Sequence, residues 1–271
     1  MRGSDKPEGK VVITVTLAHS WMFPEIGNAP VTIEEVAEAA AKCREAGAAI
    51  AHVHAEPGEW ANLVHRMRES SDILIQAGMS SYPLEQRTDA FESGPDMISV
   101  MLGQHDEAFT KKDVYAIHTR DELLAYANKC RKLGVKPEFE IWHHGSIWTL
   151  NFLVEKGVLE RPYWTTLFFG WPGGNWTPVT AEELLHRIGS MPAGSVCSVS
   201  AMGKNTWEFM RKAVSVGSNI RVGTEDCPFD ADGSAAVDNS QLVRRASMLA
   251  EEMGREIATP QEVRKIISSG Q

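Results

Sequence analysis

Two histidines, His52 and His54, follow a short run of alanine, isoleucine and valine. In a β-strand, residues two apart lie on the same face, so both imidazoles would project from one side of a strand end. Two nitrogen ligands in this arrangement can bind a transition metal such as zinc. A single histidine in a strand is more often an ordinary core residue, but a pair with this spacing favours a metal site.

The sequence around this pair alternates between predicted strands and predicted helices. Apolar, β-branched runs predict eight strands, at 11–17, 49–54, 73–77, 97–102, 138–142, 165–169, 195–200 and 220–223. Helical spacing of apolar residues predicts a helix after each, at 33–45, 60–69, 84–92, 119–133, 147–155, 180–188, 206–216 and 239–253. We expect N-caps at Thr32, with Glu35 completing a capping box, and at Thr119, Thr180 and Thr206.

This alternation predicts parallel βαβ units. Eight units in 271 residues favour an α/β fold of the (β/α)8 TIM-barrel type, as a single domain spanning residues 1–271. An open doubly wound sheet would lead us to expect a GxGxxG motif after the first strand, and the sequence has none there.

The composition argues against some classes of partner and favours one cellular compartment. The formal net charge of −9 and the lack of a long basic run argue against nucleic acid or an anionic membrane as the main partner. The four cysteines are scattered, as in reduced cytosolic proteins, and no apolar run reaches the roughly 18 residues of a membrane span. With no signal-peptide pattern, we expect a cytoplasmic protein whose polar residues 1–10 form a flexible N-terminus.

A third metal ligand is available once the barrel is closed. Active-site residues of TIM barrels lie at the C-terminal ends of the strands, and strands 49–54 and 220–223 both flank the first strand. A carboxylate just after 220–223, where Glu225 and Asp226 stand, can therefore complete a catalytic site of two histidines and one carboxylate. The alternative for Arg221, Glu225 and Asp226 is a plain surface salt-bridge cluster.

Other candidates also have ordinary structural explanations. Glu138 and Glu140 share one face of their strand and can be catalytic or form a polar layer inside the barrel. Ser80 and Ser81 can bind a substrate carboxylate or merely form a turn. Several tryptophans near strand ends, usually core residues, can also line a pocket: Trp142, Trp148, Trp164, Trp171 and Trp176.

Longer motifs resemble one enzyme family. They are TIEEVAEAAAKCREAGAAIAHVHA from Thr32, GVKPEFEIW from Gly134, SVSAMGKN from Ser198 and GSNIRVGTED from Gly217, with DNSQLVRRA and GREIATPQEVRKII after them. Over residues 12–267 the chain is similar to the β-keto acid cleavage enzymes, whose type member is the 3-keto-5-aminohexanoate cleavage enzyme. The resemblance implies a (β/α)8 barrel with Zn²⁺, or another divalent metal, on His52, His54 and Glu225.

The resemblance also implies a reaction. A β-keto acid and acetyl-CoA exchange acyl groups by a Claisen and a retro-Claisen step, which gives acetoacetate and a new acyl-CoA. It assigns Asp226 and Arg221 as an acid/base pair and Glu140 as an organising residue. One of three serines, with Ser80 ranked first ahead of Ser81 and Ser99, hydrogen-bonds the substrate carboxylate. It further implies a homo-oligomer, typically a tetramer.

Three departures from the family pattern concern the substrate region. Glu56 follows Ala55 where the family often has arginine, the segment 99–104 replaces an Asn-x-Gly-Ser turn, and Trp142-His143 replaces Phe-Asp. Trp21 stands where the family contacts the variable end of the substrate, and an aromatic ring there would suit an apolar or a cationic tail. Two other hypotheses are a metal-dependent hydrolase of the amidohydrolase type and a catalytically inactive metal-binding barrel. Amidohydrolases usually place their histidine pair on the first strand, which favours the acyl-exchange enzyme.

Overall fold

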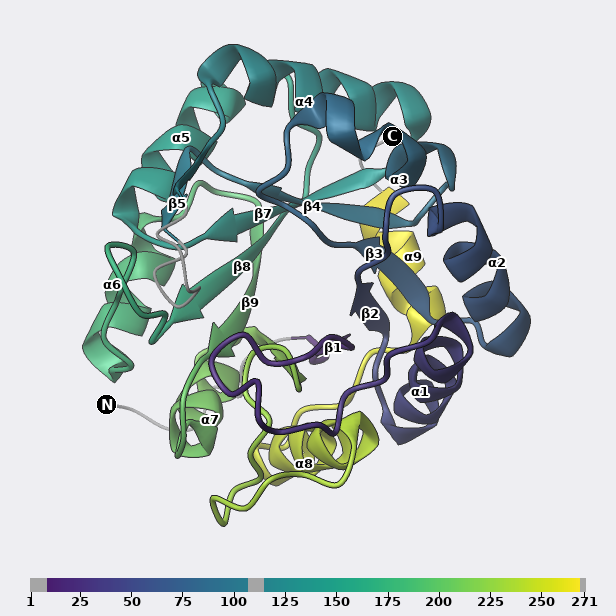
Figure 1. The fold of residues 1–271 in the computed structure, drawn as a ribbon. Coiled ribbons are helices and arrows are strands. Elements are labelled where there is room, and N and C mark those ends of the chain that lie inside the picture. The colour runs from purple at the N-terminus through teal and green to yellow at the C-terminus, as the bar shows by residue number, and fades with distance from the viewer. Residues whose placement is uncertain (1–8, 107–114, 269–271) are drawn as a thin grey trace.

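Eight parallel strands close into a barrel, as the sequence predicts (Figure 1). The structure, a computed structural model, describes residues 9–106 and 115–268. In order around the barrel, the strands are β1 (Ile13–Thr16), β2 (Ile50–Val53), β3 (Leu74–Ala77), β4 (Met97–Met101), β7 (Lys136–Ile141), β8 (Tyr163–Phe169), β9 (Ser195–Ala201) and β10 (Asn219–Gly223). Strand β1 pairs with both β2 and β10, so the C-terminal ends of β2 and β10 lie close together on either side of β1.

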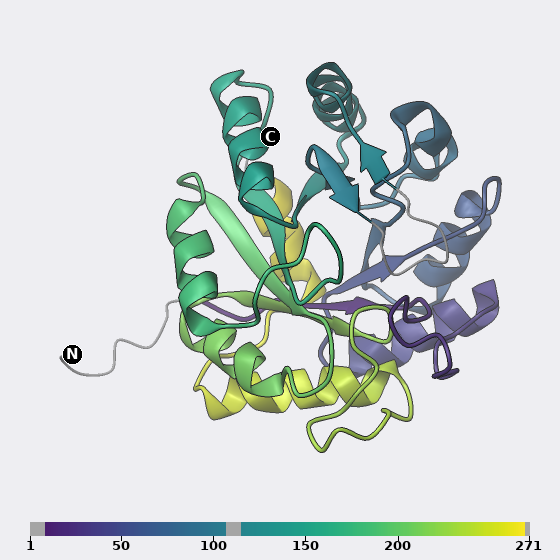
Figure 2. The ribbon, with the colours of Figure 1, turned by 60° about the vertical axis from the view of Figure 1, so that its left-hand side comes forward.

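Helices cover the outside of this barrel and lie along its strands (Figures 1 and 2). They are α1 (Ile33–Ala46), α2 (Trp60–Ser70), the 3₁₀ turn η1 (Leu84–Arg87) with α3 (Thr88–Glu92), α4 (Arg120–Leu133), α5 (His144–Glu155), α6 (Ala181–Ser190), α7 (Trp207–Ser215) and α8 (Asn239–Glu252). A continuous apolar core lies between the helices and the outward side of the strands. The predicted TIM barrel is therefore confirmed, with element ends that differ by a few residues.

Local capping chemistry explains several helix starts. Thr32 caps α1, and Glu35 accepts the Thr32 backbone N–H in return, so the expected capping box is present. Thr119 and Thr180 cap α4 and α6 through their side chains. Thr206 stands at the N-cap position of α7 as expected, but its side chain makes no capping hydrogen bond.

Three elements of the structure, two short strands and a helix, are not predicted from the sequence. The segment after β4 contains a small antiparallel pair, β5 (Gln104–Asp106) and β6 (Tyr115–Ile117), where the sequence indicates only a charged loop. A further helix, α9 (Pro260–Ser268), follows α8. Its Val263 and Ile267 pack with residues near the start of the barrel strands, so α9 closes the end of the barrel opposite the site.

The prediction of a flexible N-terminus falls mostly outside the described residues. The flexible start was expected over residues 1–10, of which 1–8 lie outside the described residues; Lys10 forms ion pairs with Glu256 and Glu262. Within the described ranges, no helix is long and apolar enough to cross a membrane.

Candidate active site

The histidine pair lies where its spacing predicts, on one face at the end of β2. The Nε2 atoms of His52 and His54 are 3.1 Å apart. Glu225, just after β10, places its carboxylate oxygens 3.7 Å from His52 Nε2 and 3.4 Å from His54 Nε2. One ligand atom from each residue thus falls within 4.8 Å of the others, which is the separation that a shared metal ion requires.

Neighbouring residues orient the two imidazoles. Gln76 stands opposite His52 in the register of β2 and β3, and its Oε1 lies 2.8 Å from His52 Nδ1. An amide oxygen only accepts, so Nδ1 carries the proton and Nε2 presents its lone pair. The backbone of Gly78 packs so closely beneath the pair that a Cβ there would lie 2.6 Å from His54 Nε2 and 2.9 Å from His52 Nε2.

These three residues fit a divalent cation. Glu225 Oε2 is buried and has no hydrogen-bond donor among the described residues, although it lies 3.7 Å from His52 Nε2. Burial, followed by the charge of Arg221, lowers the pKa of His52 well below its usual value. Burial opposes ionisation of Glu225, but the facing histidines and Arg221 lower its pKa overall. His52 and Glu225 therefore favour the deprotonated form that metal binding needs.

Arg221 and Asp226 form a second buried group beside the triad. Arg221 donates Nε to Asp226 Oδ2 at 2.7 Å and Nη2 to Oδ1 at 3.0 Å, and Ser200 Oγ donates to Oδ2 at 2.6 Å. Burial would lower the pKa of Arg221, but the Asp226 and Glu225 carboxylates raise it further above its ordinary value. Arg221 Nη1 has no hydrogen-bond acceptor among the described residues. The surface salt-bridge alternative for this cluster is wrong, since all three side chains are buried.

Glu140 and Glu138 differ in depth. Glu140 Oε2 accepts Ser80 Oγ at 2.6 Å and Trp142 Nε1 at 3.0 Å, and burial raises the pKa of Glu140. Glu138 is fully buried, and burial together with Glu140 raises its pKa to about 8. Glu140 lines the cavity described next and Glu138 does not, so the polar-layer interpretation suits Glu138.

A cavity of about 280 Å³ joins most of the predicted residues. Those that line it are Trp21, His52, His54, Ser80, Ser81, Glu140, Arg221, Glu225 and Asp226. Ser99 does not line it; this serine is fully buried and donates to the carbonyl of Ala77 at 3.2 Å. Of the three serines proposed for the substrate carboxylate, the structure therefore brings only Ser80 and Ser81 to the cavity.

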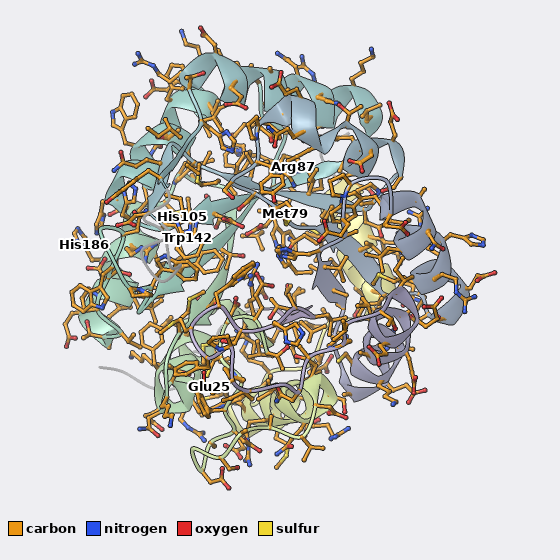
Figure 3. The ribbon with its side chains drawn as sticks, in the orientation of Figure 1. Glu25, Met79, Arg87, His105, Trp142 and His186 are labelled. Carbon is orange, nitrogen blue, oxygen red and sulfur yellow. The ribbon has the colours of Figure 1, made fainter. Side chains whose placement is uncertain are left out.

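Sequence reasoning missed another part of the cavity wall. His105 on β5, Ala116 on β6 and Met202, just after β9, line the cavity. Of the five tryptophans expected as core or pocket residues, Trp142 and Trp171 line it and the other three do not. In Figure 3, His105 and Trp142 lie side by side at the left of the barrel opening, and Met79 lies near its centre. The two short strands of this wall carry no clear alternation of apolar residues, so the sequence offered little signal for His105.

A second group of two histidines and a glutamate lies outside this cavity. His144 at the start of α5 and Glu183 and His186 on α6 place ligand atoms within 4.8 Å of one another. His144 Nε2 is 3.2 Å from Glu183 Oε1, and both histidines are exposed. Figure 3 shows His186 at the outer edge of the molecule.

The chain is similar to known enzymes over almost its whole length. The sequence model of the beta-keto acid cleavage enzyme family matches residues 10–268. The chain is 29% identical to a 3-keto-5-aminohexanoate cleavage enzyme of Acetoanaerobium sticklandii, covering 95% of this chain and 98% of the relative. It is also 29% identical to a 3-dehydrocarnitine:acetyl-CoA trimethylamine transferase of Rhizobium meliloti, covering 88% and 89% of the two chains.

A solved structure supports the fold independently. The apo structure of ObcA superposes with a TM-score of 0.73 at 16% sequence identity, covering 89% of this chain. The chain spans 65% of the length of ObcA. At this identity the likeness supports the barrel architecture alone.

Proposed function

Since the chain belongs to the beta-keto acid cleavage enzyme family, we propose that it transfers the acetyl group of acetyl-CoA to a β-keto acid. The products are acetoacetate and the CoA thioester of the remaining acyl fragment. One observation carries the proposal: the His52–His54–Glu225 triad, in which His52 and Glu225 are buried and His54 is half-buried, lines the same cavity as the Arg221–Asp226 pair. The name of the Rhizobium meliloti relative includes acetyl-CoA, which supports the cosubstrate.

A divalent cation, Zn²⁺ by the nature of the ligands, would be held by His52, His54 and Glu225. Such a cation supplies Lewis-acid polarisation of the ketone and carboxylate oxygens of a β-keto acid. Ser80 and Ser81 lie on the same cavity wall, where a hydroxyl can donate to the substrate carboxylate. Ser80 already donates to Glu140, so protonation of Glu140 would release the Ser80 hydroxyl for the substrate.

Arg221 and Asp226 have different roles in the proposed reaction. Because its pKa is raised, Arg221 stays protonated and acts as a fixed cation, not as the base. Its unpartnered Nη1 donates to oxygens on which negative charge develops. Asp226 Oδ1 accepts one hydrogen bond and keeps a lone pair for the C2 proton of the substrate.

In the proposed reaction, each bond that forms is matched by a bond that breaks. Asp226 takes the C2 proton, and C2 attacks the acetyl carbonyl, forming a carbon–carbon bond and expelling the CoA thiolate. The thiolate attacks the original ketone carbon, and the bond between C2 and that carbon breaks. Asp226 returns the proton to C2, which is now part of acetoacetate, and the acyl fragment leaves as its CoA thioester. Assembly into a homotetramer and a cytoplasmic location belong to the proposal as predictions.

A coupled product analysis tests this function. The Zn²⁺-loaded protein, given acetyl-CoA and a β-keto acid, should form acetoacetate and a new acyl-CoA in equal amounts by mass spectrometry. Asp226→Asn should lower kcat by at least about 1000-fold while Zn²⁺ stays bound. Hydrolysis without acetyl-CoA would instead indicate a hydrolase, and binding without turnover would indicate an inactive barrel.

A further inference from the structure

The residues that line the cavity fall into two chemically different parts. One part carries every ionisable side chain already assigned to metal binding and proton transfer: His52, His54, Glu140, Arg221, Glu225 and Asp226. The other part, which we call the second end, is an adjoining wall of His105, Ala116, Trp142, Trp171 and Met202, which meets the first part where Trp142 Nε1 donates to Glu140. The carboxylate and ketone shared by all β-keto acids suit the first part. The described lining left for the variable tail is the second end together with Trp21, Met79 and Tyr82, none of which carries a carboxylate, ammonium or guanidinium group.

The second end offers no charged partner among the described residues. Ala116, Trp142, Trp171 and Met202 carry no ionisable group. His105 is buried, and that burial lowers its pKa to about 4, so it is neutral near pH 7. The acidic residue of the same hairpin, Asp106, does not line the cavity, and its carboxylate accepts the backbone N–H of Gly174.

The aromatic rings of this end are stacked on one another. Trp142 lies between Phe168, at a centroid distance of 3.9 Å and an angle of 11°, and His105, at 4.2 Å and 35°. Arg221 lies over the Phe168 ring, with its Cζ 4.9 Å from the centroid. Because both faces of Trp142 are covered, they are not available to a quaternary ammonium group, which binds over open aromatic faces.

Hydrogen bonds fix the position of this wall. Trp171 Nε1 donates to the Asp106 carbonyl at 2.9 Å, and the Asp106 N–H donates to Asn175 Oδ1 at 3.0 Å. These bonds join the β5–β6 pair to the loop after β8. A fixed wall cannot rearrange to solvate an ion, so it selects by polarity.

We propose that the tail of the β-keto acid used by this protein is uncharged and apolar. The inference rests on the proposed function and goes one step further, because it names the class of acid. A tail that carries a carboxylate or an ammonium would be buried without a charged partner among residues 9–106 and 115–268, which is strongly unfavourable. An alkyl tail would gain contact with the indoles and with Met202.

The matched pair of 3-oxohexanoate and 3-oxoadipate tests the proposal most sharply. Both have six carbons, and they differ by a terminal methyl in place of a terminal carboxylate. We expect kcat/KM with acetyl-CoA to be on the order of 100-fold higher for 3-oxohexanoate. For two cationic acids, 3-keto-5-aminohexanoate and 3-dehydrocarnitine, kcat/KM should be lower than for 3-oxohexanoate by a similar factor. Equal or better turnover of any charged acid would overturn the proposal.

Binding separates this inference from the proposed reaction. Calorimetry with the Zn²⁺-loaded protein should rank the four acids in the same order without requiring turnover. If 3-oxohexanoate binds tightest but no acid yields acetoacetate, the reaction is wrong and the tail preference is supported. If 3-oxoadipate binds as tightly as 3-oxohexanoate, the tail preference is wrong.

A charge placed in the wall should change the preference. Met202→Lys adds a cation of similar length, and we expect 3-oxoadipate to gain at least about 10-fold in kcat/KM relative to 3-oxohexanoate. Met202→Gln is the control, because it adds polarity without charge and should lower 3-oxohexanoate turnover with no gain for 3-oxoadipate. An equal gain in both variants would contradict the inference. The comparison of acids on the unmodified protein remains decisive if Met202→Lys does not fold.

Discussion

Within the described part of the chain, a close group of two histidines and one glutamate occurs twice, in very different surroundings. His52, His54 and Glu225 lie at the strand ends inside the barrel, whereas His144, Glu183 and His186 lie on its outer helices. In each group the ligand atoms are within 4.8 Å of one another. Proximity alone therefore does not distinguish the two.

Their surroundings do distinguish them. The inner group is held by paired strands, oriented by Gln76 and backed by Gly78. In the outer group, the His144 side chain is 45% exposed and His186 is exposed as well, so water can solvate both rings. Residues that orient ligands strengthen a metal site, and here they are found around the inner group. The two groups therefore differ in the residues that hold the ligands and not in ligand type, and this difference favours the inner group as the proposed metal site.

The largest effect should come from removing an inner ligand. His52→Ala leaves two ligands, so the variant should no longer bind Zn²⁺ tightly. Its kcat should fall by at least about 1000-fold. Metal content after dialysis, measured by plasma mass spectrometry, checks the first part. Undiminished zinc in this variant would place the metal elsewhere.

Closing the space behind the inner ligands should have the next largest effect. In Gly78→Ala the new methyl would collide with the Nε2 atoms of both His52 and His54. We expect zinc affinity to fall by at least about 100-fold, because the ligand atoms can no longer converge. Chelator competition measures this affinity. A comparable loss in Gly189→Ala, where a Cβ on helix α6 meets nothing within 4 Å, would show that the effect is not local.

Removal of the orienting hydrogen bond should have an intermediate effect. Gln76→Met keeps the volume of the side chain but removes the acceptor for His52 Nδ1–H, so zinc affinity should fall by about 10- to 100-fold. Gln76→Glu keeps an acceptor and should retain most of the affinity. Equal losses in the two variants would show that packing, and not the hydrogen bond, positions His52.

The smallest effect should come from the outer group. His186→Ala should change kcat/KM by less than about 2-fold and the free energy of unfolding by less than about 0.5 kcal/mol. Zinc retained after dialysis should equal that of the unmodified protein. Loss of one tightly held zinc in this variant would show that the outer group binds metal as strongly as the inner one.

Much of the fold follows from the sequence because its signals are local. Apolar runs and threonine caps mark strands and helices, and the parity of a strand correctly places His52 and His54 on one face. Helix α9 had such a signal that was overlooked: Thr259 and Glu262 cap one another as Thr32 and Glu35 do. The β5–β6 pair had none, since three-residue strands carry too few positions to show a period.

The depth of a side chain inside the barrel could not be predicted from local sequence signals. Alternation places Ser99 and Glu138 on the inward face, as it does Glu140, but it does not say how far each lies from the opening. The two deeper residues are fully buried and do not reach the cavity. Contacts between distant segments, such as Asp106 with Asn175, depend on the closed barrel and have no local signature.

The fate of isotopically labelled acetyl-CoA tests the proposed acyl exchange most directly. Zinc-loaded protein would be incubated with 3-oxohexanoate and acetyl-CoA labelled with ¹³C at both acetyl carbons. Acetoacetate labelled at C3 and C4, together with unlabelled butyryl-CoA, is the predicted result, and His52→Ala should form neither product. Unlabelled acetoacetate, or labelled acetate released with free CoA, would contradict the proposed exchange at the His52–His54–Glu225 centre.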